Sequence, residues 1–132
     1  MHNDKIALVT GATRGIGLET ARQLATQGVH TLLAGRDRDK AVKVARELQA
    51  EGLPVEAIAL DVTDEAGVHA AAREVEQRHG RLDILVNNAG IVRDDFERVP
   101  SGQSPRSWRE TLDTNLFGMV ATTQAILPLL RR

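Results

Sequence analysis

The segment T-G-A-T-R-G-I-G, residues Thr10–Gly17, decides the fold of this 132-residue chain. It follows a short apolar run, Ile6–Val9, and opens a segment with helical periodicity, Ile16–Leu24. A glycine-rich turn between a strand and a helix is typical of phosphate binding. The reason is that a helix N-terminus offers unpaired N–H groups and the positive end of the helix dipole. The segment therefore predicts a βα unit that binds a phosphate group.

The three glycines of this turn have separate expected roles. Gly11 permits a tight turn, Gly15 lets a pyrophosphate approach the backbone, and Gly17 lets the helix pack closely against the strand. The spacing is G-x-x-x-G-x-G, rather than the G-x-G-x-x-G of most dinucleotide-binding folds. Three glycines alone are weak evidence, so the prediction depends on the strand and helix around them.

Length and composition fit one globular domain, residues 1–132. A net charge of −1 gives no reason to expect binding to nucleic acid or to a membrane surface. The absence of cysteine excludes disulfides and thiolate chemistry. No apolar run is long enough to span a bilayer, and the N-terminal residues lack a secretory signal pattern. We therefore expect a cytoplasmic location.

Four short apolar runs alternate with four segments of helical periodicity. The expected strands are Ile6–Val9, Val29–Ala34, Val55–Leu60 and Leu82–Val86. The expected helices are Gly15–Gln27, Asp39–Glu51, Asp64–His79 and Ser107–Leu130. Gly28, Gly52 and Gly80 follow the first three helices, where a left-handed cap favours glycine. Ser107 and Glu110 form a capping-box pattern at the start of the fourth helix.

The alternation predicts an α/β fold with a doubly wound parallel sheet. The strands are almost wholly apolar, as expected for parallel strands covered on both faces. Right-handed crossovers give the strand order 3-2-1-4, with two helices on each face. In such sheets ligands bind beyond the carboxyl ends of the strands, where the winding direction changes. Here that point lies between the first and fourth strands, next to the glycine turn.

Three further motifs follow the expected elements. The pair Asp61-Val62 follows the third strand, Asn87-Asn88-Ala89-Gly90 follows the fourth, and Asn115 lies within the fourth helix. Together with the glycine turn, these motifs resemble those of the classical short-chain dehydrogenase/reductase family, in the same order and on the same elements. The resemblance covers essentially the whole chain.

The resemblance implies a Rossmann-type fold and hydride transfer between C4 of a nicotinamide dinucleotide and a carbonyl or alcohol carbon. It implies that Asn115 is the asparagine of the family's catalytic tetrad. The cofactor-binding residues that it implies are Gly11, Thr13, Arg14, Gly15, Ile16, Gly17, Arg36, Asp61, Val62, Asn88, Ala89 and Gly90.

Several of these residues also have structural interpretations. The Asp61 carboxylate could accept a hydrogen bond from the adenine amine, or it could cap the helix Asp64–His79. Asn87 could hold the turn after the fourth strand against the first strand, with or without a functional role. Gly90 could make room for the nicotinamide ribose, or it could serve loop flexibility.

The choice of cofactor depends on the end of the second strand. An acidic residue there would bind a ribose 2′-hydroxyl and repel a 2′-phosphate. This chain has Gly35 followed by Arg36, and Arg14 in the glycine turn supplies a second guanidinium. Because guanidinium groups fit phosphate oxygens, we expect NADP(H) to be preferred over NAD(H). Asp37 could instead bind a 2′-hydroxyl, although it could also cap the next helix.

The sequence contains no tyrosine. Of the family's catalytic tetrad, it supplies only Asn115. In the resembling family, members roughly twice this length carry the catalytic Ser and Tyr-x-x-x-Lys beyond the fourth helix. One interpretation is therefore an oxidoreductase that acts on a small carbonyl or alcohol only when a C-terminal portion is supplied. The alternative is a non-catalytic nucleotide-binding or interaction module. We expect the 132 residues alone to bind cofactor without turnover.

Two expectations concern other binding partners. The four histidines show no metal-ligand spacing, so we expect no metal site. The last helix carries apolar residues around most of its circumference, and the outer edge of the fourth strand lacks a partner. We therefore expect a homo-oligomer formed through the last helix or the fourth-strand edge.

Overall fold

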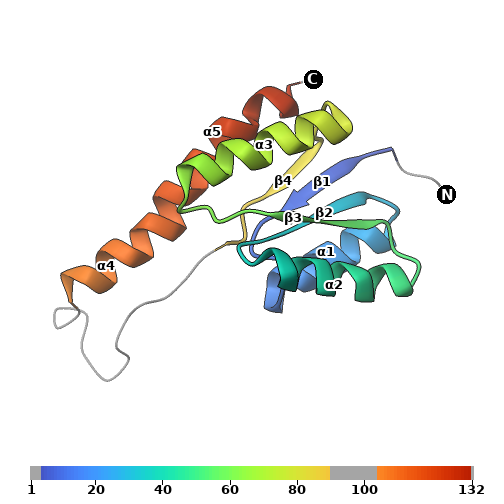
Figure 1. The fold of residues 1–132 in the computed structure, drawn as a ribbon, viewed down its shortest axis with the longest axis horizontal. Helices are drawn as coiled ribbons and strands as arrows, with labels where there is room; N and C mark the ends of the chain where they lie inside the picture. The colour runs from blue at the N-terminus through green and yellow to red at the C-terminus, as the bar shows by residue number, and fades with distance from the viewer. Residues whose placement is uncertain (1–3, 90–103, 132) are drawn as a thin grey trace.

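The computed structural model describes residues 4–89 and 104–131 and shows a four-stranded parallel sheet between two layers of helices (Figure 1). The strands are β1 (Ile6–Val9), β2 (His30–Gly35), β3 (Val55–Ala59) and β4 (Ile84–Val86). The helices are α1 (Gly15–Thr26), α2 (Arg38–Ala50), α3 (Glu65–His79), α4 (Pro105–Leu112) and α5 (Met119–Leu130). A π-helical segment, Asp113–Gly118, joins α4 to α5.

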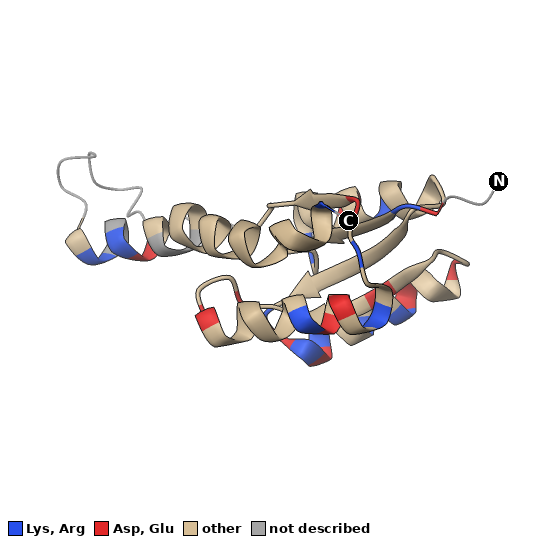
Figure 2. Ribbon diagram, turned by 90° about the horizontal axis from the view of Figure 1, so that it is seen from above, with Lys and Arg blue, Asp and Glu red and all other residues tan. Residues whose placement is uncertain are grey.

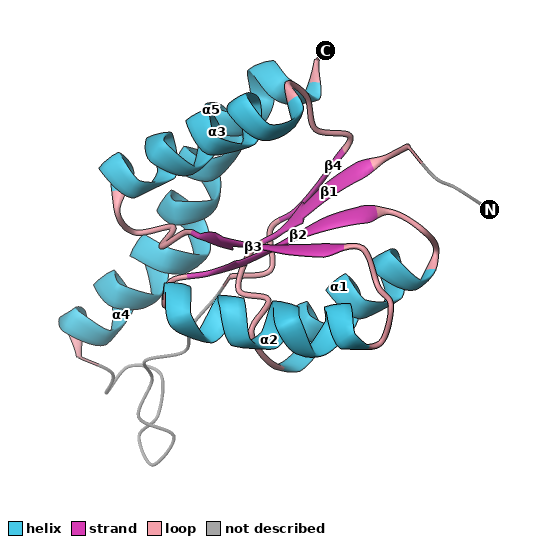
Figure 3. Cartoon of the chain, turned by 45° about the vertical axis from the view of Figure 1, so that its right-hand side comes forward, coloured by secondary structure: helices cyan, strands magenta, loops and turns pink. Residues whose placement is uncertain are grey.

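The strand order is β3-β2-β1-β4 and every pairing is parallel, which confirms the predicted doubly wound sheet. Consecutive strand residues point to opposite faces, and both faces are apolar. Leu8 and Leu32 pack with α3 and α5, whereas Val9 and Leu33 pack with α1 and α2. Figure 3 shows these two helix pairs on the two sides of the sheet. The predicted arrangement of two helices on each face is confirmed.

The glycines that were expected to end the first three helices adopt the left-handed conformation. Gly28 and Gly52 have φ of +85°, and Gly80 has φ of +74°. A Cβ atom is disfavoured in this region, which explains why a glycine follows the end of each helix.

The predicted start of the fourth helix, at Ser107, is wrong. α4 begins at Pro105, so Ser107 is the third residue of the helix and does not mark its start. Proline suits a first helical position because its ring fixes φ near the helical value and its missing N–H has no helical partner there. Glu110 accepts a hydrogen bond from Arg106 Nε at 2.9 Å. The predicted single helix also differs, since the π-helical segment interrupts it.

The last strand is shorter than predicted. The backbone N–H of Leu82 donates to the carbonyl of Leu129 in α5 at 3.1 Å. Leu82 is therefore bonded to a helix, and β4 begins at Ile84.

The segment from α4 to α5 exposes much of its apolar surface. α5 contains no charged residue, in contrast to α2 (Figure 2). The exposed large apolar residues of this segment are Leu112, Leu116, Phe117, Met119 and Val120. Even so, no helix in the described part of the chain is both long and apolar enough to cross a membrane.

Candidate functional site

The glycine turn is anchored to both neighbours of β1 at the carboxyl end of the sheet. The backbone N–H of Thr10 donates to the carbonyl of Val86 in β4 at 3.1 Å. The N–H of Ala12 donates to the carbonyl of Ala34 in β2 at 2.9 Å. Because β2 and β4 lie on opposite sides of β1, the turn lies at the predicted point where the winding direction changes.

Two glycines of the turn are left-handed, and their surroundings differ. Gly11 has φ of +58°, and a Cβ there would lie 2.9 Å from the Cα of Ala89. Gly15 has φ of +61°, and no described atom beyond its chain neighbours and the nearby backbone of its own helix lies within 4 Å of such a Cβ. Gly11 is thus required for contact with the turn after β4. Gly15 leaves the backbone open at the start of α1, as expected for a site that a phosphate approaches.

Gly17 has a different role from the predicted one. A Cβ on this residue would lie 2.3 Å from the carbonyl oxygen of Gly11 and 2.3 Å from Asn88 Nδ2. The absence of a side chain at Gly17 therefore makes room for the Gly11 carbonyl and the Asn88 amide. Neither of these residues lies in a strand, whereas the prediction was a close contact with the strand.

Asn88 connects the turn after β4 to the glycine turn. Its Nδ2 donates to the carbonyl of Gly11 at 3.1 Å. The backbone N–H groups of Asn88 and Ala89 donate to the Thr10 hydroxyl at 3.0 and 2.9 Å. Thr10 is only 1% exposed. The sequence motifs did not predict a role for its hydroxyl. A small hydroxyl residue directly before the first glycine was the available signal.

The expectation for Asn87 is wrong. Its Nδ2 donates to the Thr123 hydroxyl of α5 at 3.2 Å, so its side chain binds a helix and not the first strand. Successive residues in an extended segment point to opposite sides, and this is why the two neighbouring asparagines have different partners. The link to the glycine turn belongs to Asn88.

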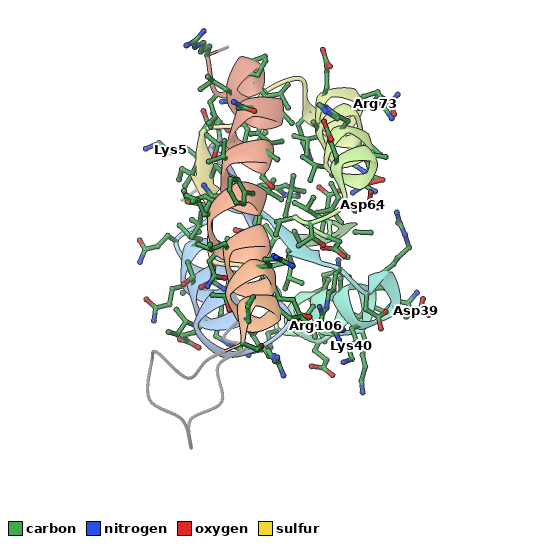
Figure 4. All side chains as sticks on the ribbon, turned by 90° about the vertical axis from the view of Figure 1, so that its left-hand side faces the viewer. Lys5, Asp39, Lys40, Asp64, Arg73 and Arg106 are labelled. Atoms are coloured by element: carbon green, nitrogen blue, oxygen red, sulfur yellow. The ribbon has the colours of Figure 1, made fainter. Side chains whose placement is uncertain are left out.

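The N-terminus of α1 has no side-chain cap, in contrast to that of α2. At α2, Asp37 Oδ1 accepts from the N–H groups of Asp39 and Lys40 at 3.0 and 3.2 Å. Figure 4 labels Asp39 and Lys40 at this capped end. Among the described residues, no side chain caps α1, where Arg14 is the N-cap residue, and its first turn contains no acidic residue. The dipole and N–H groups of α1 therefore remain available to a negative ligand.

Asp37 caps α2, as one of its two interpretations predicts. Arg14 and Arg36 are both exposed at this end of the sheet. Gly35 packs against the turn, since a Cβ on it would lie 2.6 Å from Thr13 Cγ2. A larger side chain at position 35 would therefore require Thr13 to move. Ile16 is 80% exposed.

Asp61 forms a local turn after β3 and does not cap α3. Its Oδ1 accepts from the backbone N–H and the hydroxyl of Thr63, at 3.0 and 2.6 Å. The N-cap residue of α3 is Asp64, labelled in Figure 4, and its side chain makes no capping hydrogen bond within the described residues. The capping interpretation of Asp61 is therefore not observed. Val62 is buried in the core on the α3 side of the sheet.

Asn115 lies in the π-helical segment and is exposed. Short π-helical turns are frequent at functional sites, where they change the direction in which side chains project. Gly90, the last residue of the Asn-Asn-Ala-Gly motif, lies outside the described residues. The structure thus brings together Gly11, Gly17, Asn88 and Ala89, while Asp61 and Asn115 lie on separate elements.

Comparison with known proteins gives relatives that match this chain along nearly its whole length. The chain is 41% identical over 134 residues to a 3-oxoacyl-(acyl-carrier-protein) reductase, FabG, of Staphylococcus aureus, covering 100% of this chain and 53% of the relative. It is 40% identical over 128 residues to the short-chain dehydrogenase anuI of Penicillium roqueforti, covering 96% and 50%. The chain therefore spans about half the length of the curated relatives it matches.

A solved structure supports the same relationship. The gluconate 5-dehydrogenase of Burkholderia cenocepacia, in complex with NADP and tartrate, aligns with a TM-score of 0.87 and 38% identity. That alignment covers 96% of this chain and 49% of the other. The sequence model described as short chain dehydrogenase matches residues 5–132. The chain therefore belongs to the short-chain dehydrogenase/reductase family.

Proposed function

We propose that this chain is the dinucleotide-binding part of an NADP(H)-dependent oxidoreductase. The observation that carries the proposal is the uncapped N-terminus of α1, which follows Gly11 and Gly15 at the carboxyl ends of β1 and β4. A pyrophosphate placed there meets free N–H groups and the positive end of the helix dipole. The bond from Asn88 to Gly11 holds the turn in this shape.

The preference for NADP(H) follows from the charges around the end of β2. Arg14 and Arg36 are exposed and can bind a ribose 2′-phosphate with charge-assisted hydrogen bonds. The carboxylate of Asp37, which could repel that phosphate, is oriented by its bonds to the first turn of α2. Gly35 provides no acidic group for a 2′-hydroxyl. The NADP bound to the gluconate 5-dehydrogenase supports this choice.

Other residues are proposed to surround the remainder of the cofactor. Asp61, oriented by Thr63, and the adjacent Val62 would contact the adenine ring after β3. Ala89 and Gly90 would line the path of the nicotinamide ribose after β4. Thr13 and Ile16 would complete the wall of the site along the glycine turn, together with Gly17.

The proposed reaction is hydride transfer between a nicotinamide and a carbonyl or alcohol carbon. The nicotinamide supplies or accepts the hydride, and the residues described above bind and orient its carrier. Asn115 would help to position the groups that handle the proton at the substrate oxygen. The names of the relatives, a reductase and two dehydrogenases, support this oxidoreductase over a non-catalytic binding module.

Calorimetric titration with NADPH and NADH tests the proposal. We expect NADPH to bind more tightly, and Arg36→Asp to lower NADPH affinity about 10- to 100-fold, the equivalent of one charge-assisted hydrogen bond. NADH affinity should change little. The control is Arg38→Asp, which makes the same change of charge at an exposed residue outside the proposed site. Equal affinity for both cofactors, or an equal loss in the control, would refute the assignment.

A further inference from the structure

Three ionisable side chains from separate elements meet where β2 and β3 begin, at the end of the sheet opposite the glycine turn. His30 is the first residue of β2, Glu56 is the second residue of β3, and His79 is the last residue of α3. Because the strands are parallel, these residues mark the amino ends of β2 and β3, whereas the glycine turn lies at the carboxyl ends. The cluster is therefore separate from the candidate dinucleotide site.

The two imidazole rings converge on one carboxylate oxygen. His30 Nε2 contacts Glu56 Oε2 directly, and His79 Nε2 lies 3.0 Å from the same oxygen. Each residue offers one ligand atom, and these atoms all lie within 4.8 Å of one another. Two donors bound to a single tetrahedral zinc ion at about 2.0–2.2 Å lie roughly 3.3–3.5 Å apart. Small movements of the side chains are therefore enough to place all three around one ion.

From this geometry we propose that His30, Glu56 and His79 bind a divalent transition-metal ion of the zinc class. Two imidazole nitrogens with one carboxylate oxygen form a donor set that suits zinc. Magnesium and calcium, in contrast, prefer oxygen ligands throughout. The side chains are 33%, 31% and 18% exposed for His30, Glu56 and His79, respectively. Water can therefore reach the ion and complete its coordination.

The charges around the cluster leave one carboxylate oxygen available for a cation. Arg78 Nη1 lies 3.3 Å from Glu56 Oε1, and its Nη2 lies 3.3 Å from Glu74. Oε2 thus faces only the two histidines among the ion pairs of the described residues. His79 also lies in the last turn of α3, where the helix dipole favours positive charge.

An ion at this position would join three elements of the fold. It would link the end of α3 to the amino ends of β2 and β3. Since the three ligands come together only in the folded chain, binding of the ion would stabilise the folded state. Its place, far from the glycine turn, assigns it a structural role.

Zinc titration of the purified, untagged and chelator-treated protein tests the site, with calorimetry and thermal unfolding as readouts. We expect one ion per chain and a rise in Tm. His30→Gln and His79→Gln should each lower zinc affinity by at least about tenfold, because each removes one ligand. The control is His69→Gln, which replaces an exposed histidine of the same helix, α3. It should leave the affinity and the Tm shift unchanged.

A second readout does not depend on the folding of any variant. In the wild-type protein, the imidazole NMR resonances of His30 and His79 should shift on addition of zinc, while that of His69 stays in place. Affinity weaker than about 0.1 mM would overturn the proposal. Unchanged binding in the variant that lacks both His30 and His79, or a loss in His69→Gln as large as in His79→Gln, would also overturn it.

Discussion

Replacing Gly17 by alanine should destabilise the protein, although alanine is normally preferred to glycine inside a helix. The added Cβ would lie 2.3 Å from both the Gly11 carbonyl oxygen and Asn88 Nδ2. These two atoms form the 3.1 Å hydrogen bond that joins the turn after β4 to the glycine turn. One of them belongs to the backbone and cannot rotate away, so the contact can be relieved only by moving the turn.

The size of the effect follows from three contributions. Overpacking of a tight site costs about 1–3 kcal/mol. Breaking the bond between Asn88 and Gly11 and leaving its polar groups unpaired costs about 1–3 kcal/mol. The higher helix propensity of alanine returns about 1 kcal/mol. We therefore expect the free energy of unfolding to fall by about 3 kcal/mol, within a range of roughly 1–5 kcal/mol.

Gly67→Ala is the matched control, because Gly67 is the third residue of α3 as Gly17 is of α1. The nearest atom to its added Cβ is Asp64 Oδ2 at 2.9 Å, the end of a flexible side chain. This variant should be as stable as the wild type, or more stable by up to about 1 kcal/mol. Urea unfolding followed by circular dichroism measures both variants, with an unchanged m-value as the test of two-state behaviour. Equal stability of the two variants would refute the described packing of the turn.

The remaining predictions concern a helix cap, self-association and activity. Asp37→Ala should lower the free energy of unfolding by about 1 kcal/mol, since it removes both bonds to the first turn of α2; no change in urea unfolding would contradict the cap. The exposed apolar residues of the α4–α5 segment should cause self-association, so Leu116→Asp should shift the mass measured by light scattering toward the monomer. A wild-type monomer at high concentration would contradict this. The 132 residues alone should bind NADPH without oxidising it in the presence of ketones or aldehydes, because they contain no tyrosine to act as the proton donor. Turnover that is abolished by Gly15→Val would overturn that expectation.

The topology could be predicted because it depends on local patterns and one general rule. Apolar runs alternate with helical segments, and right-handed crossovers then leave few arrangements of four parallel strands. The position of the glycine turn between β1 and β4 follows from the same argument. The left-handed glycines after α1, α2 and α3 could be predicted for a related reason, since the cap depends on nearby residues only.

The roles of single residues around the turn were harder to predict. Asn87 and Asn88 are chemically identical neighbours, and their partners depend on which way each one points after β4. Thr10 accepts two backbone N–H groups from a segment that lies more than 70 residues away in the chain. The start of α4 was missed because Ser107 and Glu110 fit a capping pattern that ignores the proline two positions earlier.

The cluster of His30, Glu56 and His79 could not be predicted from the sequence alone. Glu56 is 26 residues from His30 and 23 from His79, so no short motif connects them. Their meeting depends on the register in which Leu32 pairs with Glu56, which places the side chains of His30 and Glu56 on the same face. It depends also on the length of α3, whose last residue is His79 on that face of the sheet. A slip of one residue between β2 and β3 would turn Glu56 to the opposite face. The donor set is therefore a property of the sheet register, and a count of histidine spacings cannot detect it.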